Sequence, residues 1–155
     1  MRIVLFALEY FALIQIKTII KKAVLLEILY SKIIKSYILN KDIEIYGKGD
    51  QSRDFIYVKD ICSSIKKCLK RKYGYNEYHI GTGQETTINK LLKMLNKIFH
   101  TYDISQPLIR YTNKRKGDMK NNSLDISKTK TLLRWKPRYT LNDGLLNTIK
   151  WYLKN

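Results

Sequence analysis

The stretch Ile45-Tyr46-Gly47-Lys48-Gly49-Asp50-Gln51-Ser52-Arg53-Asp54-Phe55-Ile56-Tyr57-Val58-Lys59-Asp60 decides the fold that we expect for this chain. Gly47 and Gly49 indicate a tight turn, because glycine adopts a positive φ without steric cost. The alternation of side chains over residues 54–58 predicts a strand with one buried face. Asp60 precedes an apolar run, so we expect it to cap the N-terminus of a helix. The stretch therefore predicts turn, strand and helix in succession.

Arg53 is the first candidate binding residue of this stretch. It is expected at the exposed start of the strand, directly after the glycine turn. The planar guanidinium of arginine can meet a phosphate with two parallel hydrogen bonds. An ordinary surface arginine paired with Asp50 or Asp54 fits the same spacing. The residues around Arg53 leave both interpretations open.

Composition places the chain among globular proteins of about one domain. Its 155 residues are 45% hydrophobic and carry a formal net charge of +17. That length is sufficient for an ordinary core. The charge admits an alternative function, a basic nucleic-acid-binding module, with a phosphate backbone along Lys66, Lys67, Lys70, Arg71 and Lys72. The lysines are scattered among other residue types, however, which favours a solvated basic surface and no nucleic-acid partner.

Residues 1–40 are expected to form an apolar, largely helical N-terminal segment. Glu9 interrupts the apolar run and no small-residue cleavage site follows, which argues against a secretory signal. The uncharged stretch is also too short to span a bilayer. Leu26, Tyr30, Ile33 and Tyr37 share one face of a helix expected over residues 18–39. We therefore expect a protein of the cytoplasm with no membrane partner.

The two cysteines, Cys62 and Cys68, fit the same compartment. They lie six residues apart on one expected helix, too far apart for a disulfide within it. No further ligand nearby indicates a zinc site, and we assign no metal. Both are expected to be buried thiols in a reducing environment.

Periodicity and turn residues predict the elements that follow the central stretch. They are a helix over residues 61–73, a strand over 78–80, a helix over 88–99, a strand over 108–112, a helix from 125 or 127 to 133, and a helix from 140 to 152. Thr86 or Thr87 is expected to cap the second helix, and Thr140 with Asp143 to form a capping box on the last. Gly81-Thr82-Gly83 is weak evidence for a dinucleotide site, and a tight turn is the preferred interpretation.

Four blocks of this sequence carry a resemblance to a known family. They are Tyr46 to Asp60, Tyr78-His79-Ile80-Gly81-Thr82-Gly83, Arg115-Lys116-Gly117-Asp118, and Asp125 to Lys128 leading to Leu133-Arg134-Trp135-Lys136-Pro137 and Gly144 to Trp151. In this order they resemble the C-terminal part of the NAD-dependent epimerase/dehydratase family. These extended short-chain dehydrogenases, such as UDP-glucose 4-epimerase, act on nucleotide sugars. Arg134 departs from the family pattern, which has glycine there.

The resemblance implies an α/β fold and a division of the chain. Residues 41–155 would be the nucleotide-sugar-binding C-terminal portion, and residues 1–40 a helical segment of uncertain origin. The N-terminal Rossmann domain of the family would be missing. The family's glycine-rich loop and catalytic Tyr-x-x-x-Lys belong to that domain. No Gly-x-x-Gly-x-x-Gly occurs in this sequence, and Tyr37, four residues before Lys41, is expected in the core.

The resemblance also implies the ligand and the residues that hold it. Arg53 and Arg115 would contact the diphosphate of a nucleoside diphosphate sugar, and Asp118 would accept hydrogen bonds from the ribose. No catalytic or cofactor-binding residue is assigned. The chain is thus expected to be a truncated epimerase (isomerase) or dehydratase (lyase), inactive alone and without its own NAD. A separately encoded Rossmann half is its expected partner.

Overall fold

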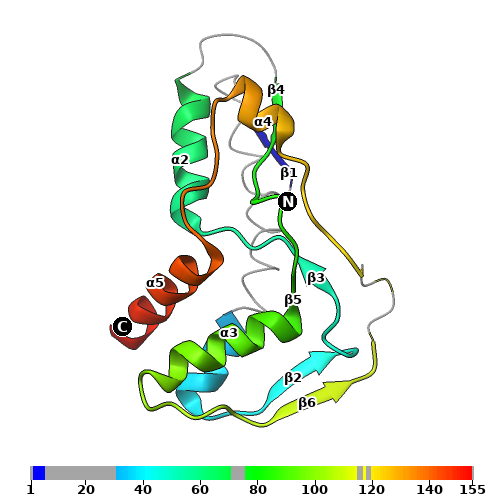
Figure 1. Cartoon of the computed structure of the whole chain (residues 1–155), viewed down its shortest axis with the longest axis vertical. Helices are drawn as coiled ribbons and strands as arrows, with labels where there is room; N and C mark the ends of the chain where they lie inside the picture. The colour runs from blue at the N-terminus through cyan, green and yellow to red at the C-terminus, as the bar shows by residue number, and fades with distance from the viewer. Residues whose placement is uncertain (1, 6–30, 71–75, 115–116, 118–119, 155) are drawn as a thin grey trace.

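The structure is a computed structural model that describes residues 2–5, 31–70, 76–114, 117 and 120–154 (Figure 1). Its strands are β1 (Arg2–Leu5), β2 (Ile43–Tyr46), β3 (Ser52–Arg53), β4 (Asn76–His79), β5 (Thr86–Thr87) and β6 (Ile109–Thr112). Its labelled helices are α2 (Val58–Leu69), α3 (Ile88–His100), α4 (Ser127–Leu132) and α5 (Leu141–Lys154). Residues 31–39 are also helical. The described chain is therefore α/β, as expected.

The strands form three separate pairs. β1 and β4 are antiparallel, β2 and β6 are parallel, and β3 and β5 are antiparallel. In the parallel pair, Ile43 lies opposite Ile109 and Tyr46 opposite Thr112. Figure 1 shows β2, β6 and α3 at one end of the molecule, and α2, α4 and β4 at the other. The strand expected over residues 108–112 is confirmed as β6.

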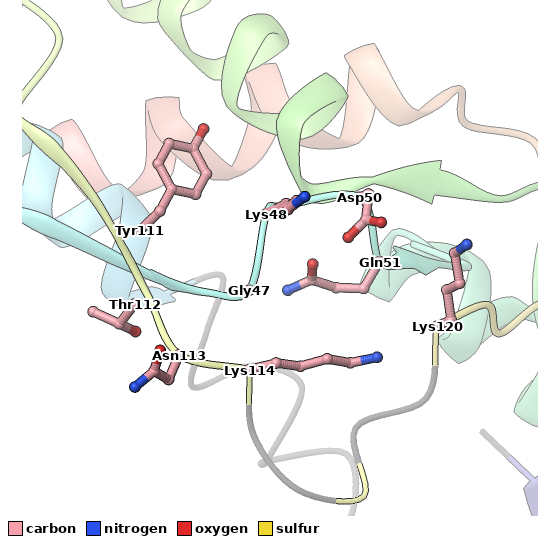
Figure 2. Close-up of a pocket in the computed structure, with 9 residues that line it drawn as sticks. All are labelled: Gly47, Lys48, Asp50, Gln51, Tyr111, Thr112, Asn113, Lys114 and Lys120. Carbon is pink, nitrogen blue, oxygen red and sulfur yellow. The ribbon is translucent and has the colours of Figure 1, made fainter.

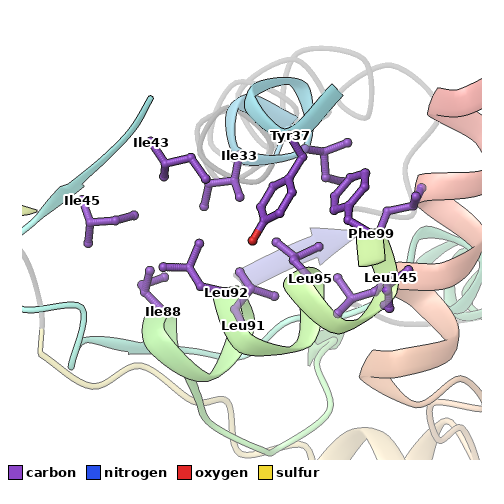
Figure 3. Close-up of a cluster of buried hydrophobic side chains, with 13 residues drawn as sticks. Ile33, Tyr37, Ile43, Ile45, Ile88, Leu91, Leu92, Leu95, Phe99 and Leu145 are labelled. Carbon is purple, nitrogen blue, oxygen red and sulfur yellow. The ribbon is translucent and has the colours of Figure 1, made fainter. Parts of the chain in front are cut away.

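The main core lies around α3 (Figure 3). Leu91, Leu95 and Phe99 recur at helical spacing on its inner face and are fully buried. Thr87 caps the helix by accepting a hydrogen bond from the amide of Lys90, which confirms one of the two expected caps. The other side chains of this core come from residues 31–39, β2 and α5: Ile33, Ile34, Tyr37, Ile43, Ile45, Leu145 and Ile149. The helix of residues 31–39 thus shares a core with the elements beyond residue 40.

Tyr37 is a core residue, as expected. Its ring stacks on that of Phe99 with centroids 4.4 Å apart and planes 8° from parallel. Among the described residues, its hydroxyl has no hydrogen-bond partner. Burial raises the pKa of Tyr37 to about 12. The hydroxyl is therefore expected to destabilise the fold, because a buried polar group without a partner keeps its desolvation cost.

We expect Tyr37→Phe to raise the free energy of unfolding at pH 7 by about 1 kcal/mol. The wild type should also lose stability as the pH rises from about 10 to 12, because the unfolded tyrosine ionises before the folded one. The variant should lack this component. Urea unfolding at pH 7, 9 and 11 measures both effects. A less stable Phe variant at pH 7 would contradict the prediction.

The strand expected over residues 54–58 is wrong. β3 contains only Ser52 and Arg53, and the next four residues are irregular up to Val58, where α2 begins. The physical reason lies in Asp54. Its carboxylate accepts hydrogen bonds from the amides of Thr82 and Gly83, so tertiary contacts override the alternating pattern.

Asp60 is not the helix cap that we expected. It lies in the first turn of α2, whose N-cap residue, Tyr57, makes no side-chain capping bond. The side chain of Asp60 is buried, and its two oxygens accept from the amides of Arg138, at 2.9 Å, and Tyr139, at 3.1 Å. Asp60 therefore fastens the segment before α5 to α2.

A smaller core lies between α2 and β4. Its buried members are Tyr78, Ile80, Leu133 and Trp135. The indole nitrogen of Trp135 donates to the hydroxyl of Ser63 at 2.8 Å. Arg134 has a φ of +47°, so it adopts the conformation for which glycine is the usual residue. Cys68 is half-buried and Cys62 is exposed, which corrects the expectation of two buried thiols.

The last two helices begin differently. α4 begins at Ser127 after Ile126, which makes no side-chain capping bond, while Asp125 accepts from the Ser127 amide at 2.9 Å. The capping box on α5 is confirmed, because Thr140 and Asp143 exchange hydrogen bonds at 3.1 Å between side chain and amide. The carboxylate of Asp143 also accepts from the Thr140 hydroxyl, and this bond, followed by the one from the Thr140 amide, lowers the pKa of Asp143. No helix among the described residues is long and apolar enough to cross a membrane.

Candidate functional site

The glycine turn connects β2 to β3, and it needs both glycines. Gly47 and Gly49 have φ values of +75° and +72°. A Cβ on Gly49 would lie 2.1 Å from Oδ1 of Asn89, closer than atoms can approach. The Nδ2 group of Asn89 donates to the carbonyl of Lys48 at 2.9 Å, and the Asn89 amide donates to that of Gly49 at 3.0 Å. The first turn of α3 therefore holds the glycine turn in place.

A basic hollow of about 620 Å³ adjoins this turn (Figure 2). It lies where the parallel strands β2 and β6 both end, and the amide of Gly47 donates to the carbonyl of Thr112 at 2.9 Å there. The carboxyl ends of parallel strands are the usual place for ligands in α/β proteins. The residues that line the hollow are Gly47, Lys48, Asp50, Gln51, Tyr111, Thr112, Asn113, Lys114 and Lys120.

The charge of this hollow favours an anion. Three lysines and a single carboxylate, Asp50, line it. Figure 2 shows the side chains of Lys114 and Lys120 extending toward the side of the turn on which Gln51 lies. Gln51 donates to the carbonyl of Tyr46 at 2.8 Å, which fixes its side chain beside the turn. Several cations around one hollow at a strand end suit a phosphate-bearing ligand.

Arg53 lies beside the hollow, not among the residues that line it. It is half-buried in β3 opposite Thr86, and its Nη1 group donates to the carbonyl of Ser52 at 2.7 Å. The amide of Ser52 donates to the carbonyl of Lys120 at 2.8 Å. Arg53 therefore adjoins the chain segment that ends at Lys120.

Arg115 and Asp118 lie outside the described residues. They belong to the segment between Thr112 and Lys120, and the structure describes both of its ends. Thr112 is bonded to Gly47 and Lys120 to Ser52. Both ends of the segment are thus hydrogen-bonded to the block that contains Arg53.

Asp54 has a structural role that the sequence analysis missed. It accepts from the amide of Thr82 at 2.9 Å and from that of Gly83 at 2.9 Å, and a Cβ on Gly81 would lie 2.6 Å from its carboxylate. The amides of this Gly-x-Gly turn are therefore already bonded to an anionic group. The turn does not fit the pyrophosphate of NAD, because a second anion would be repelled there. Local sequence patterns do not predict this contact, because Asp54 and Thr82 lie 28 residues apart.

The basic residues along α2, which the alternative nucleic-acid-binding function would use, have different surroundings in the structure. The ammonium of Lys67 donates to the carbonyl of Arg134, while Lys66 and Lys70 are exposed. Arg71 and Lys72 lie outside the described residues. Within the part of the chain that the structure describes, there is no group of histidine, cysteine and carboxylate side chains that could hold a metal.

Comparison with known proteins gives consistent matches. The chain is 33% identical over 131 residues to the dTDP-glucose 4,6-dehydratase of Haemophilus influenzae, covering 79% of this chain and 38% of that protein. The structure of UDP-glucose 4-epimerase from Thermotoga maritima with UDP-glucose matches with a TM-score of 0.68 at 31% identity, covering 79% of this chain and 38% of that one. MoeE5 in complex with UDP-glucuronic acid and NAD matches with a TM-score of 0.73 at 27% identity, covering 80% and 40%.

The fold and these matches define an α/β protein of the nucleotide-sugar epimerase and dehydratase class. The chain belongs to the family whose model is described as GDP-mannose 4,6 dehydratase, which matches residues 22–148. The family resemblance seen in the sequence is therefore confirmed. The match begins at residue 22, within the segment before residue 41. The chain spans less than half the length of each of these three relatives.

Proposed function

We propose that this chain binds the nucleoside diphosphate of a nucleotide sugar, as the C-terminal, substrate-binding portion of an epimerase or dehydratase. The observation that carries the proposal is the pair of backbone hydrogen bonds, Gly47 to Thr112 and Ser52 to Lys120. They bring both ends of the segment containing Arg115 and Asp118 to the block that contains Arg53. Relatives solved with UDP-glucose and with UDP-glucuronic acid support the ligand class.

The three proposed residues divide into two roles. Arg53 and Arg115 neutralise the diphosphate through charge-assisted hydrogen bonds, and Asp118 accepts from the ribose hydroxyls. The hollow at the glycine turn adds the positive field of Lys114 and Lys120. We further propose that the protein works in the cytoplasm, where the thiols of Cys62 and Cys68 would stay reduced.

We also propose that these 155 residues do not catalyse a reaction alone. Epimerisation and dehydration in this family use NAD, and a relative is solved with NAD bound. Among the described residues, the Gly81-Thr82-Gly83 turn does not fit it, because Asp54 already bonds its amides. Binding only the nucleotide, equally in ground and transition states, accelerates nothing. A Rossmann half with a glycine-rich loop and a Tyr-x-x-x-Lys would have to supply the chemistry.

Replacing Arg53 or Arg115 by alanine is expected to weaken UDP-glucose binding by about 2 kcal/mol, roughly 30-fold, because each variant loses charge-assisted hydrogen bonds. Isothermal calorimetry measures the effect. Arg110→Ala is the matched control, since Arg110 pairs with Asp42 at 2.6 Å and does not line the hollow. Binding that is equally tight in all three variants would remove the site, and no binding by the wild type to UDP-, dTDP- or GDP-sugars would overturn the function.

The isolated chain with added NAD is expected to convert no nucleotide sugar. The reason is positioning, since a hydride must pass between a sugar and a nicotinamide held about 3 to 3.5 Å apart. Product analysis by chromatography, against the double variant Arg53→Ala, Arg115→Ala, is the measurement. Turnover above that control would show that the chain contains catalytic residues that we have not assigned.

A further inference from the structure

We propose that Lys48 is a phosphate-binding residue of the hollow and that Asn89 is the positioning residue that holds it there. The inference rests on the proposed function and adds two residues to it. Lys48 lies between the two glycines of the turn and lines the hollow, whereas Asn89 is not among the lining residues. Asn89 therefore acts on a ligand only through its neighbours.

Asn89 joins three elements with its backbone and side chain. Its Nδ2 donates to the carbonyl of Lys48 at 2.9 Å and its amide to that of Gly49 at 3.0 Å. Its Oδ1 accepts from the hydroxyl of Tyr111 in β6 at 3.1 Å. Lys48 and Tyr111 both line the hollow. One amide side chain thus connects two walls of the hollow to the rigid first turn of α3.

Stabilising α3 does not account for this arrangement. The N-terminus of α3 is already capped by Thr87, which accepts from the amide of Lys90. The side chain of Asn89 instead donates a hydrogen bond to the glycine turn and accepts one from Tyr111 in β6. A glycine-flanked residue has a large backbone freedom, which must be lost when its side chain meets a ligand. Fixing the carbonyl of Lys48 in advance reduces that loss, which is the advantage of preorganisation.

Lys48 has the chemistry for a phosphate. Its ammonium is a compact point charge with three donors on a flexible stem. With Lys114 and Lys120 it gives the hollow three cations against the carboxylate of Asp50. A ligand with two phosphates is the class that such a cluster favours over a neutral sugar.

The test is a double-mutant cycle on UDP-glucose binding by the full chain. Lys48→Ala and Asn89→Ala are each expected to weaken binding about 5- to 10-fold. The double variant is expected to bind no more weakly than the single variant with the larger loss, because both substitutions remove the same contact. Both should reduce the salt dependence of binding, although Asn89→Ala removes no charge. Lys90→Ala, on the exposed side of the same helical turn, is the matched control.

Tyr111→Phe keeps the test decisive if Asn89→Ala folds poorly, because it removes a single hydrogen bond at an exposed ring. It is expected to weaken binding 2- to 3-fold. Additive losses in the cycle, or an Asn89→Ala variant with unchanged affinity and salt dependence, would overturn the inference. A chain whose binding depends on Arg53 but not on Lys48 would overturn this inference alone. A wild type that binds no nucleotide sugar would overturn the proposed function with it.

Discussion

Asp60→Ala is expected to lower the free energy of unfolding by about 4 kcal/mol, because a carboxylate with two backbone hydrogen bonds would be lost from a buried site. The side chain of Asp60 is 1% exposed, and the amides of Arg138 and Tyr139 donate to its two oxygens. Without it, the amides of Arg138 and Tyr139 lose the acceptor that they have in the folded chain. The segment that leads into α5 would then lose its attachment to α2. Denaturant unfolding followed by circular dichroism gives the measurement.

Two further variants serve as comparisons for Asp60→Ala. Asp60→Asn keeps one acceptor oxygen, so we expect about half of the loss. Asp42→Ala removes an exposed carboxylate from an ion pair with Arg110 and should cost less than about 1 kcal/mol. An Asp60→Ala variant as stable as Asp42→Ala would show that the two amides find other partners.

Gly49→Ala is expected to destabilise the chain by about 3 kcal/mol and to weaken nucleotide-sugar binding more than 10-fold. Part of the cost is the positive φ of +72°, which disfavours a side chain by about 1 to 2 kcal/mol. The rest comes from Asn89, whose Oδ1 lies 2.1 Å from the position of the new Cβ. Moving Asn89 breaks its hydrogen bonds to Lys48 and Tyr111, each worth about 1 kcal/mol.

Gly47→Ala separates these two contributions. Gly47 has a φ of +75°, but the nearest atom to its new Cβ would be 3.8 Å away, an ordinary contact. This variant should therefore show the backbone cost alone. Unfolding and UDP-glucose titrations on both variants make the comparison. Equal losses from the two substitutions would mean that Asn89 adapts without cost, and would weaken its assignment as a positioning residue.

Features that depend on neighbours a few residues away could be predicted from the sequence. The spacing of Leu91, Leu95 and Phe99 predicted α3, and its cap at Thr87 is one of the two candidates that the pattern offered. The exchange of hydrogen bonds between Thr140 and Asp143 was predictable because the two residues lie three apart in the sequence. The motifs around the glycine turn also indicated the family that the match over residues 22–148 confirms.

The tertiary structure alone decided the roles of the carboxylates of Asp54 and Asp60 and the geometry of the candidate site. Asp54 and Asp60 sit in local patterns typical of a strand and a helix cap, yet their partners lie 28 and 78 residues further along the chain. Their hydrogen bonds outweigh weak local preferences, because each carboxylate accepts from two backbone amides at once and hydrogen bonds to a charged group are the stronger ones. The hydrogen bond from the Ser52 amide to the Lys120 carbonyl joins the residue next to Arg53 to the end of the segment that follows β6. The periodicity of the sequence does not predict this contact either. Local sequence patterns describe neighbours within about one helical turn, and only the folded chain determines which distant groups satisfy one another.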